Sequence, residues 1–357
     1  MTSLGPERRR ALLGVEATAL VRRQWPGAAT GDVGSFAGGV TLLESATGRG
    51  WVLYDVGSAM SLGAALGWAE DHQVGELHIL MDLTRGSDRE KLGNGVAASV
   101  MARQAQTFRA RPTVWAVAGR GLERVQPADG ADPARPSDVP AGATRWEAVL
   151  VAHGVQPVVE HGALRGDVLG LEVARLVGGE AQGWRLAVGV GDHDRDARRE
   201  MVPDEDPLAA LDQVVALVRT WRSPGARLHP ANTLAPERWL RSIVTSRPLL
   251  AGAADLVPLA PPVERTDLRH RSPAPAAGTD LDGRPVVVVC STGVDIDLVP
   301  SAADSRLLDG RAARLVIVVP GGDDHPLTRR LAARLEEPPD VVTVRRDWRA
   351  LMWASAS

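Results

Sequence analysis

Acidic side chains gather in the second half of the chain, where they could hold a divalent metal ion. Asp192 and Asp194 flank His193, and carboxylate oxygens with an imidazole nitrogen can ligate Mg²⁺, Mn²⁺ or Zn²⁺. A solvated turn in which Asp192 or Asp194 caps the next segment would have the same sequence. Asp167 and Glu172 precede this cluster in RGDVLGLEVAR. These four acids are the catalytic candidates for metal-assisted hydrolysis of a phosphodiester.

A second kind of chemistry is suggested by the segment CSTGVDID, which follows an uninterrupted run of valines. Small residues directly after a strand lie where open α/β sheets bind ligands. Ser291, Thr292 and Gly293 could form a nest of backbone N–H groups and hydroxyls for an anion or nucleotide. Carboxylates from both regions make up the predicted metal-ligand set, which is Glu172, Asp192, Asp295 and Asp297.

The elements that must position these residues follow from hydrophobic periodicity and turn residues. The first half predicts a helix at residues 6–24, a β-hairpin at 38–58 and a helix that Ser58 or Ser61 caps and that runs through Ala69. A strand at 76–83, a helix at 97–108 and a strand at 113–117 follow. The second half predicts helices at 145–153, 208–221, 236–244 and 326–335, a hairpin over 167–194, and strands at 285–291, 313–320 and 340–344. The Val- and Ile-rich strands near the C-terminus are typical of a sheet buried on both faces.

The order of these elements predicts an α/β protein of two tandem modules. Residues 125–143 contain four prolines and no apolar periodicity, so we expect an interdomain linker there. The first module spans residues 1–124 and the second spans 144–357, with a Pro- and Ala-rich arm at 250–284. Each module is expected to hold a mixed sheet with a β-hairpin flanked by helices.

Two hairpins suggest that the modules arose by duplication. GVTLLESATGRGWVLYDVG and GLEVARLVGGEAQGWRLAVGVG both run from Gly through an apolar strand and a turn to Gly-Trp-x-Leu and Val-Gly. Each half later has a strand, a helix, a proline and a strand. Trp51 and Trp184 would then be equivalent core residues.

A helix, a hairpin, a further strand and a helix–strand finish resemble the restriction-endonuclease-like core. That family uses acidic residues on the hairpin and a following Asp/Glu-x-Lys to hold a divalent metal and activate water. The resemblance implies that Asp167 and Glu172 lie near its first acidic ligands. The nearest match in the first module is Asp55 with Glu76-Leu77-His78, which lacks the lysine. The resemblance covers element order over most of the chain and no diagnostic motif.

Composition excludes several classes of protein. Lys91 is the only lysine, so no P-loop motif is present, and its polar surroundings disfavour Schiff-base chemistry. The net charge of −3 shows no global basic excess for nucleic-acid binding. The single cysteine, Cys290, and the absence of a signal-peptide pattern or a long apolar run predict a cytoplasmic protein without a membrane partner.

Together these observations predict a non-catalytic binding or scaffold protein with a degenerate endonuclease-like fold. Its expected partner is another protein or a small anionic ligand, and no cofactor is assigned. The alternative is a metal-dependent nuclease or other phosphodiester hydrolase that uses acidic residues of the second module, with Mg²⁺ or Mn²⁺ as its cofactor.

Overall fold

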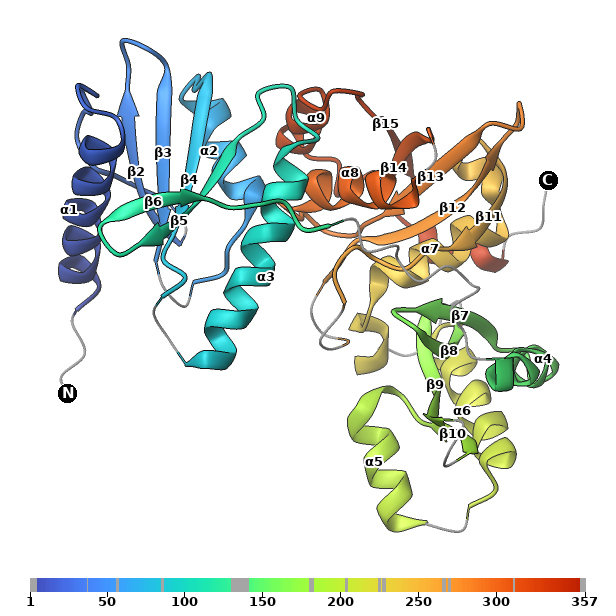
Figure 1. Ribbon diagram of the computed structural model, residues 1–357. Helices are drawn as coiled ribbons and strands as arrows, with labels where there is room; N and C mark the ends of the chain where they lie inside the picture. The colour runs from blue at the N-terminus through green and yellow to red at the C-terminus, as the bar shows by residue number, and fades with distance from the viewer. Residues whose placement is uncertain are drawn as a thin grey trace. The chain divides into compact units, whose positions relative to one another are not determined.

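The computed structural model shows an α/β protein whose described residues form three β-sheets (Figure 1). The described residues are 5–36, 38–55, 58–84, 87–129, 141–179, 183–202, 205–223, 226, 229–264, 268, 271–310 and 312–353. Contacts along the chain divide it into two units. Unit 1 comprises Met1–Ala131, Ile296–Asp304 and His325–Pro338, and unit 2 comprises Asp132–Asp295, Ser305–Asp324 and Pro339–Ser357.

A six-stranded mixed sheet forms the centre of unit 1, with its strands in chain order. The strands are β1 (Gly34–Phe36), β2 (Gly39–Glu44), β3 (Arg49–Tyr54), β4 (Glu76–Met81), β5 (Thr113–Ala118) and β6 (Gly121–Arg124). β2 and β3 form the predicted hairpin. β3, β4 and β5 run parallel because α2 (Leu62–Asp71) and α3 (Asp88–Ala105) return the chain between them.

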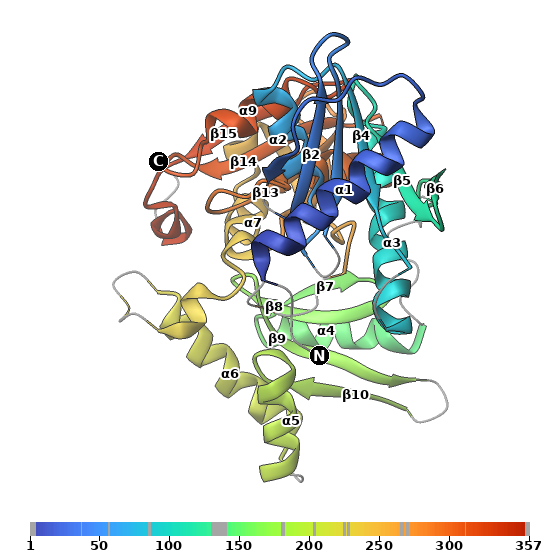
Figure 2. The same cartoon turned by 90° about the vertical axis from the view of Figure 1, so that its left-hand side faces the viewer.

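Helix α1 (Pro6–Gln24) lies across one face of this sheet, as Figure 2 shows. Leu13, Ala17, Leu20 and Val21 recur at helical spacing and share one buried cluster with Trp51 of β3. The predicted helix is confirmed, and its apolar residues are those that face the sheet.

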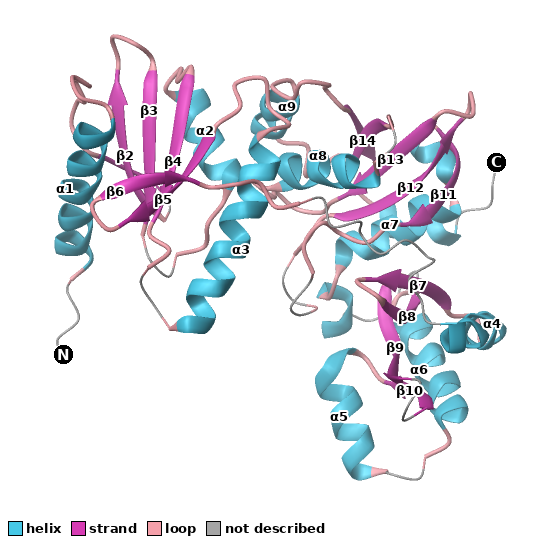
Figure 3. Ribbon diagram, viewed as in Figure 1, coloured by secondary structure: helices cyan, strands magenta, loops and turns pink. Residues whose placement is uncertain are grey.

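The first sheet of unit 2 is antiparallel, with the strand order β10–β9–β8–β7. Its strands are β7 (Gln156–Glu160), β8 (Ala163–Val168), β9 (Leu171–Gly179) and β10 (Gly183–Val188). The neighbouring helices are α4 (Thr144–Ala152), α5 (Gly191–Met201) and α6 (Pro207–Trp221), as Figure 3 shows. Leu171 and Val173 of β9 are buried in one cluster with Leu211 and Val214 of α6, so this sheet has its own hydrophobic core.

The second sheet of unit 2 is mixed, with five strands in chain order. They are β11 (Ala253–Pro258), β12 (Ala274–Asp280), β13 (Pro285–Cys290), β14 (Arg314–Pro320) and β15 (Asp340–Val344). β13, β14 and β15 are parallel, and α8 (Leu298–Asp309) and α9 (Pro326–Ala332) connect them. Helix α7 (Pro236–Ser246) packs on this sheet through Trp239 and Leu240. Consecutive β13 residues Val286 to Cys290 are all buried, which confirms a strand covered on both faces.

The three sheets differ from the expected pair of equivalent hairpins. The β9–β10 hairpin belongs to an antiparallel sheet, whereas β2–β3 continues into parallel strands. The hairpin that does continue into parallel strands in unit 2 is β12–β13. Trp51 is buried on the central strand β3, but Trp184 is only half-buried on the edge strand β10. The two tryptophans are therefore not equivalent.

The segment at 250–284 and the expected linker at 125–143 differ in how far the structure describes them. The Pro- and Ala-rich arm at 250–284 contains two strands that were not predicted, β11 and β12. Residues 130–140 of the expected linker lie outside the described residues, and the boundary between the units falls at 131/132. Segments 296–304 and 325–338 group with unit 1, so unit 2 is not one continuous range. Among the described helices, none is long and apolar enough to cross a bilayer.

Candidate functional site

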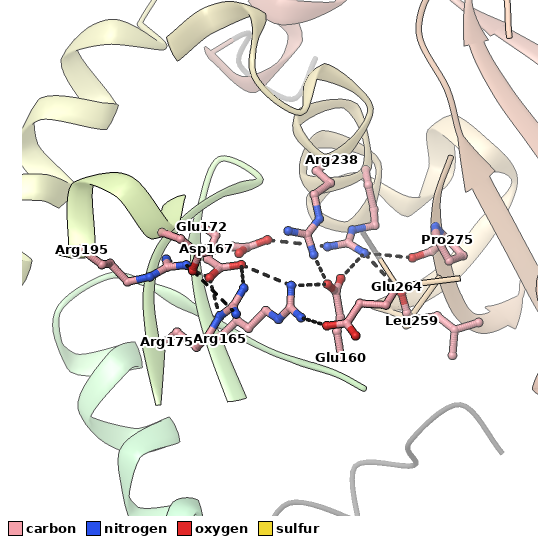
Figure 4. A network of polar contacts seen from close by, with 12 residues as sticks. Glu160, Arg165, Asp167, Glu172, Arg175, Arg195, Arg238, Leu259, Glu264 and Pro275 are labelled. Carbon is pink, nitrogen blue, oxygen red and sulfur yellow. Dashed lines mark hydrogen bonds and ion pairs between the residues drawn. The ribbon is translucent and has the colours of Figure 1, made fainter. Parts of the chain in front are cut away.

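The catalytic candidates Asp167 and Glu172 are brought together by the antiparallel sheet. They lie directly opposite each other on β8 and β9, beside a bulge in the strand register. Asp167 is 1% exposed and Glu172 is 2% exposed. Two buried carboxylates at neighbouring positions repel each other unless cations compensate them. Arginines provide that compensation here. The resulting charge network consists of Glu160, Arg165, Asp167, Glu172, Arg175, Arg195, Arg238 and Arg241 (Figure 4).

Both oxygens of Glu172 are occupied by guanidinium groups. Oε1 accepts from Arg175 Nε at 2.9 Å and lies 2.9 Å from Arg195 Nη1. Oε2 accepts from Arg165 Nη1 at 3.3 Å and from Arg175 Nη2 at 3.3 Å. Guanidinium nitrogens therefore hold the positions that a metal ion would need around this carboxylate. Glu172 is a structural anion of the sheet, not a metal ligand.

Glu160, at the end of β7, attaches the antiparallel sheet to helix α7. Its side chain accepts from Arg238 and from Arg241 Nη1, the latter at 3.3 Å. Arg241 also donates to the carbonyl oxygens of Leu259 and Pro275, so the same guanidinium reaches β12. Burial raises the pKa of Glu160, but the surrounding guanidinium charges outweigh it and lower the pKa to about 2.

Asp167 occupies the centre of the charge network without a hydrogen bond. Among the described residues neither carboxylate oxygen has a hydrogen-bond partner, and Arg241 Nη2 lies 3.6 Å from Oδ2. Burial raises the pKa of Asp167 against the opposing charges of Arg238 and Arg241. A residue so fully enclosed cannot reach a phosphodiester, so the structure does not support a catalytic role.

Asp192 and Asp194 lie inside the first turn of α5, and the residue at its N-cap position is Val190. Asp194 Oδ2 accepts from the backbone N–H of Val190 at 2.8 Å. Asp192, whose side chain is 72% exposed, pairs with Arg195 at 2.6 Å. The Arg195 hydrogen bond is the main cause of a lowered pKa for Asp192. Both carboxylates stabilise the helix start, which favours negative charge.

The four predicted metal ligands do not form a metal site. Within the described residues, no three His, Cys, Asp or Glu side chains are grouped so that they could hold a metal ion. Asp297 belongs to unit 1, where its Oδ1 accepts from Gly63 N at 2.8 Å near the start of α2. Asp295 is half-buried in the loop after β13 in unit 2. The described residues therefore give no support to an ion shared by Glu172, Asp192, Asp295 and Asp297.

The acidic match in the first module fails for a geometric reason. The parallel register places Arg49 beside Glu76 and Tyr54 beside Met81. Asp55 directly follows Tyr54, so it lies at the opposite end of the sheet from Glu76. Asp55 pairs with Arg9 at 2.7 Å, and His78 contacts Glu76 at 3.1 Å. These residues cannot share one ion.

A cavity of about 410 Å³ lies where the three parallel strands of unit 2 end. The loops after β13, β14 and β15 all contribute to it, as expected for a ligand site in an open α/β sheet. We call it the strand-end cavity. Its lining residues are Asn232, Thr233, Pro236, Arg271, Thr292, Gly293, Pro320, Gly322, Asp323, Arg346, Trp348 and Arg349.

The predicted anion-binding residues contribute unequally to this cavity. Thr292 is 8% exposed, and its hydroxyl has no hydrogen-bond partner among the described residues. Gly293 lines the cavity, but its N–H donates to Asp323 Oδ2 at 2.7 Å and is not free for an anion. Ser291 is buried and is not a lining residue; its N–H continues the sheet by donating to Val318 O. The predicted nest is thus reduced to the Thr292 hydroxyl.

Three arginines that the sequence analysis missed supply positive charge to the strand-end cavity. Arg271, Arg346 and Arg349 line it, and within the described part of the chain none has a carboxylate within 4.0 Å. Among the described residues, Arg271 donates to the carbonyl oxygen of Thr292, at 3.2 Å. Partial burial lowers the pKa of Arg349, and Asp323 opposes that effect. The signal in the sequence is the pair Arg346 and Arg349 in RRDWRA, which directly follows the predicted strand DVVTV.

Comparisons with known proteins provide no relative from which the ligand of the strand-end cavity could be inferred. No protein-family model, curated protein or solved structure matches the chain. Among the described residues, three guanidiniums, one carboxylate and a hydroxyl without a hydrogen-bond partner line one cavity. Such a set can bind an anion by charge and hydrogen bonding.

Proposed function

We propose that this chain is a binding protein for a small anionic ligand, which it holds in the strand-end cavity. The observation that carries the proposal is that Arg271, Arg346 and Arg349 face the cavity without a carboxylate partner in the described residues. All three side chains are exposed, so their guanidinium groups can reach a ligand in the cavity. An oxyanion there would accept charge-assisted hydrogen bonds from them.

The chemistry of the lining favours a phosphate-like or carboxylate anion. A guanidinium presents several N–H donors in a planar fork that matches such oxyanions. Thr292 adds a hydroxyl with free capacity, and Asp323 is already engaged by the N–H of Gly293. Three positive groups against one carboxylate leave the cavity positively charged.

The metal-dependent hydrolase alternative has no comparable support. Its proposed acids, Asp167 and Glu172, are enclosed, and guanidinium groups occupy both oxygens of Glu172. Asp192 and Asp194 stabilise the start of α5. We therefore propose binding and not phosphodiester hydrolysis.

Titration calorimetry with inorganic phosphate and pyrophosphate tests the proposal. The wild type is expected to bind at least one of them, and Arg346→Gln or Arg349→Gln should weaken binding by about tenfold or more, as expected for a lost hydrogen bond to a charged group. Arg284→Gln is the matched control, because Arg284 is an exposed arginine at the opposite end of β13, paired with Asp282. Absence of binding to the wild type, or an equal loss in Arg284→Gln, would overturn the proposal.

A further inference from the structure

A second cavity adjoins the strand-end cavity in unit 2. It has a volume of about 750 Å³ and shares four lining residues with the first: Asn232, Thr233, Arg346 and Arg349. We call it the aromatic cavity because Trp221, His229 and Trp239 line it. Both volumes fall in the range of small-molecule sites. One ligand could therefore extend from one cavity into the other.

The aromatic cavity has a flat, half-exposed wall. The rings of Trp221 and His229 stack with centroids 4.0 Å apart and an interplanar angle of 9°. Both side chains are half-buried, so the stack is held by the fold yet remains accessible. His229 Nδ1 accepts from Ala231 N at 3.2 Å, which fixes the orientation of its ring. Planar heteroaromatic groups stack on such surfaces regardless of their exact identity.

Polar atoms without partners are also present on these walls. Within the described residues, Asn232 Oδ1, Trp239 Nε1 and Thr292 Oγ1 are buried and have no hydrogen-bond partner. Trp239 is 3% exposed, and both of its neighbours Arg222 and Arg349 lie over its ring, at 4.7 and 5.4 Å from the centroid. Buried donors and acceptors are normally satisfied, so unpaired ones beside a cavity indicate a missing partner. The residues that line the two cavities thus carry one acceptor and two potential donors without a partner among the described residues.

We infer that the ligand is a nucleotide, with its phosphate in the strand-end cavity and its base in the aromatic cavity. This inference rests on the proposed anion binding and names the ligand class for the same site. A nucleotide joins an anionic group to a planar heteroaromatic ring that carries both donors and acceptors. The ribose would lie beside the shared residues, where Asn232 Oδ1 can accept from a hydroxyl.

Calorimetry with a graded ligand series separates the two halves of this inference. The probes are inorganic phosphate, ribose 5-phosphate, adenosine and the four common nucleoside 5′-monophosphates. At least one monophosphate is expected to bind about tenfold or more tightly than ribose 5-phosphate, because base stacking adds affinity that the sugar phosphate lacks. Adenosine is expected to bind more weakly than its monophosphate.

The variant His229→Asn removes the stacking ring and keeps a side chain that can cap the short helix at Pro230–Thr233. Because Trp221 remains, it should reduce nucleotide affinity by about fivefold or more, whereas the affinity for ribose 5-phosphate should change less than about twofold. His325→Asn is the matched control, because His325 Nδ1 also accepts from a backbone N–H, that of Leu327, at 3.2 Å. Its nucleotide affinity should equal that of the wild type.

The outcomes distinguish this inference from the proposed function. If phosphate and ribose 5-phosphate bind but no nucleotide binds more tightly, the nucleotide inference is overturned and anion binding stands. If no phosphate compound binds, both are overturned. If adenosine binds as tightly as its monophosphate, or His325→Asn weakens binding as much as His229→Asn, the two-cavity arrangement is overturned.

Discussion

The charge network and the strand-end cavity use the same side chain, arginine, in opposite ways. In the charge network each buried carboxylate is surrounded by guanidiniums, and Glu160 and Glu172 are almost fully enclosed. In the strand-end cavity Arg271, Arg346 and Arg349 face open space, with no carboxylate within ion-pair distance in the described residues. The guanidiniums of the charge network join elements of the fold, whereas those of the strand-end cavity are available to bind a ligand.

The comparison shows that a density of charged residues does not by itself indicate chemistry. Asp167 and Glu172 resemble a catalytic pair in sequence, but their surroundings satisfy or bury them. Thr292 carries no charge, yet its hydroxyl is buried in a residue that lines a cavity and has no partner among the described residues. The presence or absence of an internal partner therefore separates structural ions from binding groups.

The largest expected effect comes from removing one anion of the charge network. Glu160→Gln leaves Arg238 and Arg241 with reduced compensation while they remain buried. We expect a loss of about 3–5 kcal/mol in the free energy of unfolding, measured by urea denaturation. A loss below about 1 kcal/mol would contradict the view that the network joins β7 to α7.

Acid should produce the next largest effect, and its sign follows from Glu160. The pKa of this group is lowered from 4.5 to about 2 on folding, so its stabilisation is complete above 4.5 and is lost as the pH falls toward 2. The shift corresponds to roughly 3 kcal/mol. Asp167, whose pKa is raised, contributes with the opposite sign.

The pH effect can be isolated by comparing the wild type with Glu160→Gln across that pH range. The Glu160 charge is one cause of the raised pKa of Asp167, so the contribution of Asp167 cancels only in part and makes the difference smaller. The stability difference should shrink as the pH falls from about 5 to about 2. A difference that stays constant with pH would show that packing, and not charge, makes Glu160 important.

The smallest effect is expected in the strand-end cavity. Arg346 is exposed and has no carboxylate partner in the described part of unit 2, so Arg346→Gln should change the unfolding free energy by less than about 0.5 kcal/mol without ligand. Urea denaturation of the ligand-free variant measures it. A destabilisation comparable to that of Glu160→Gln would mean that Arg346 is structural, and the contrast between the two regions would disappear.

The fold was predictable where local pattern and packing agree. The valines of β13 and the helical spacing of Leu13, Ala17 and Leu20 led to the correct elements. β12, with the sequence APAAGTD, was missed because Ala, Pro and Gly disfavour strands. β12 lies between β11 and β13, so pairing on both sides holds it in place. Tertiary pairing here overrides a weak local preference.

The candidate site was predictable only in part, for a related reason. Thr292 and Gly293 follow a recognisable strand, so their position at a ligand-binding edge could be inferred. Arg271 precedes that strand and Arg346 follows another strand, far apart in sequence. Antiparallel pairing of β12 with β13 places Arg271 beside the end of β13, and the parallel order of β13, β14 and β15 brings the loop of Arg346 to the same cavity. The spacing of these residues in the sequence does not show that they meet in space.

The reactivity of the single cysteine reports how often the five-stranded sheet opens. Cys290 is the last residue of β13, is fully buried, and lies two positions before Thr292. Burial raises the pKa of its thiol to about 12, so the native state offers almost no reactive thiolate. A thiol reagent can therefore label this chain only during moments when β13 is exposed. The labelling half-life measures how often those moments occur, and a ligand that bridges the loops after β13, β14 and β15 would lengthen it.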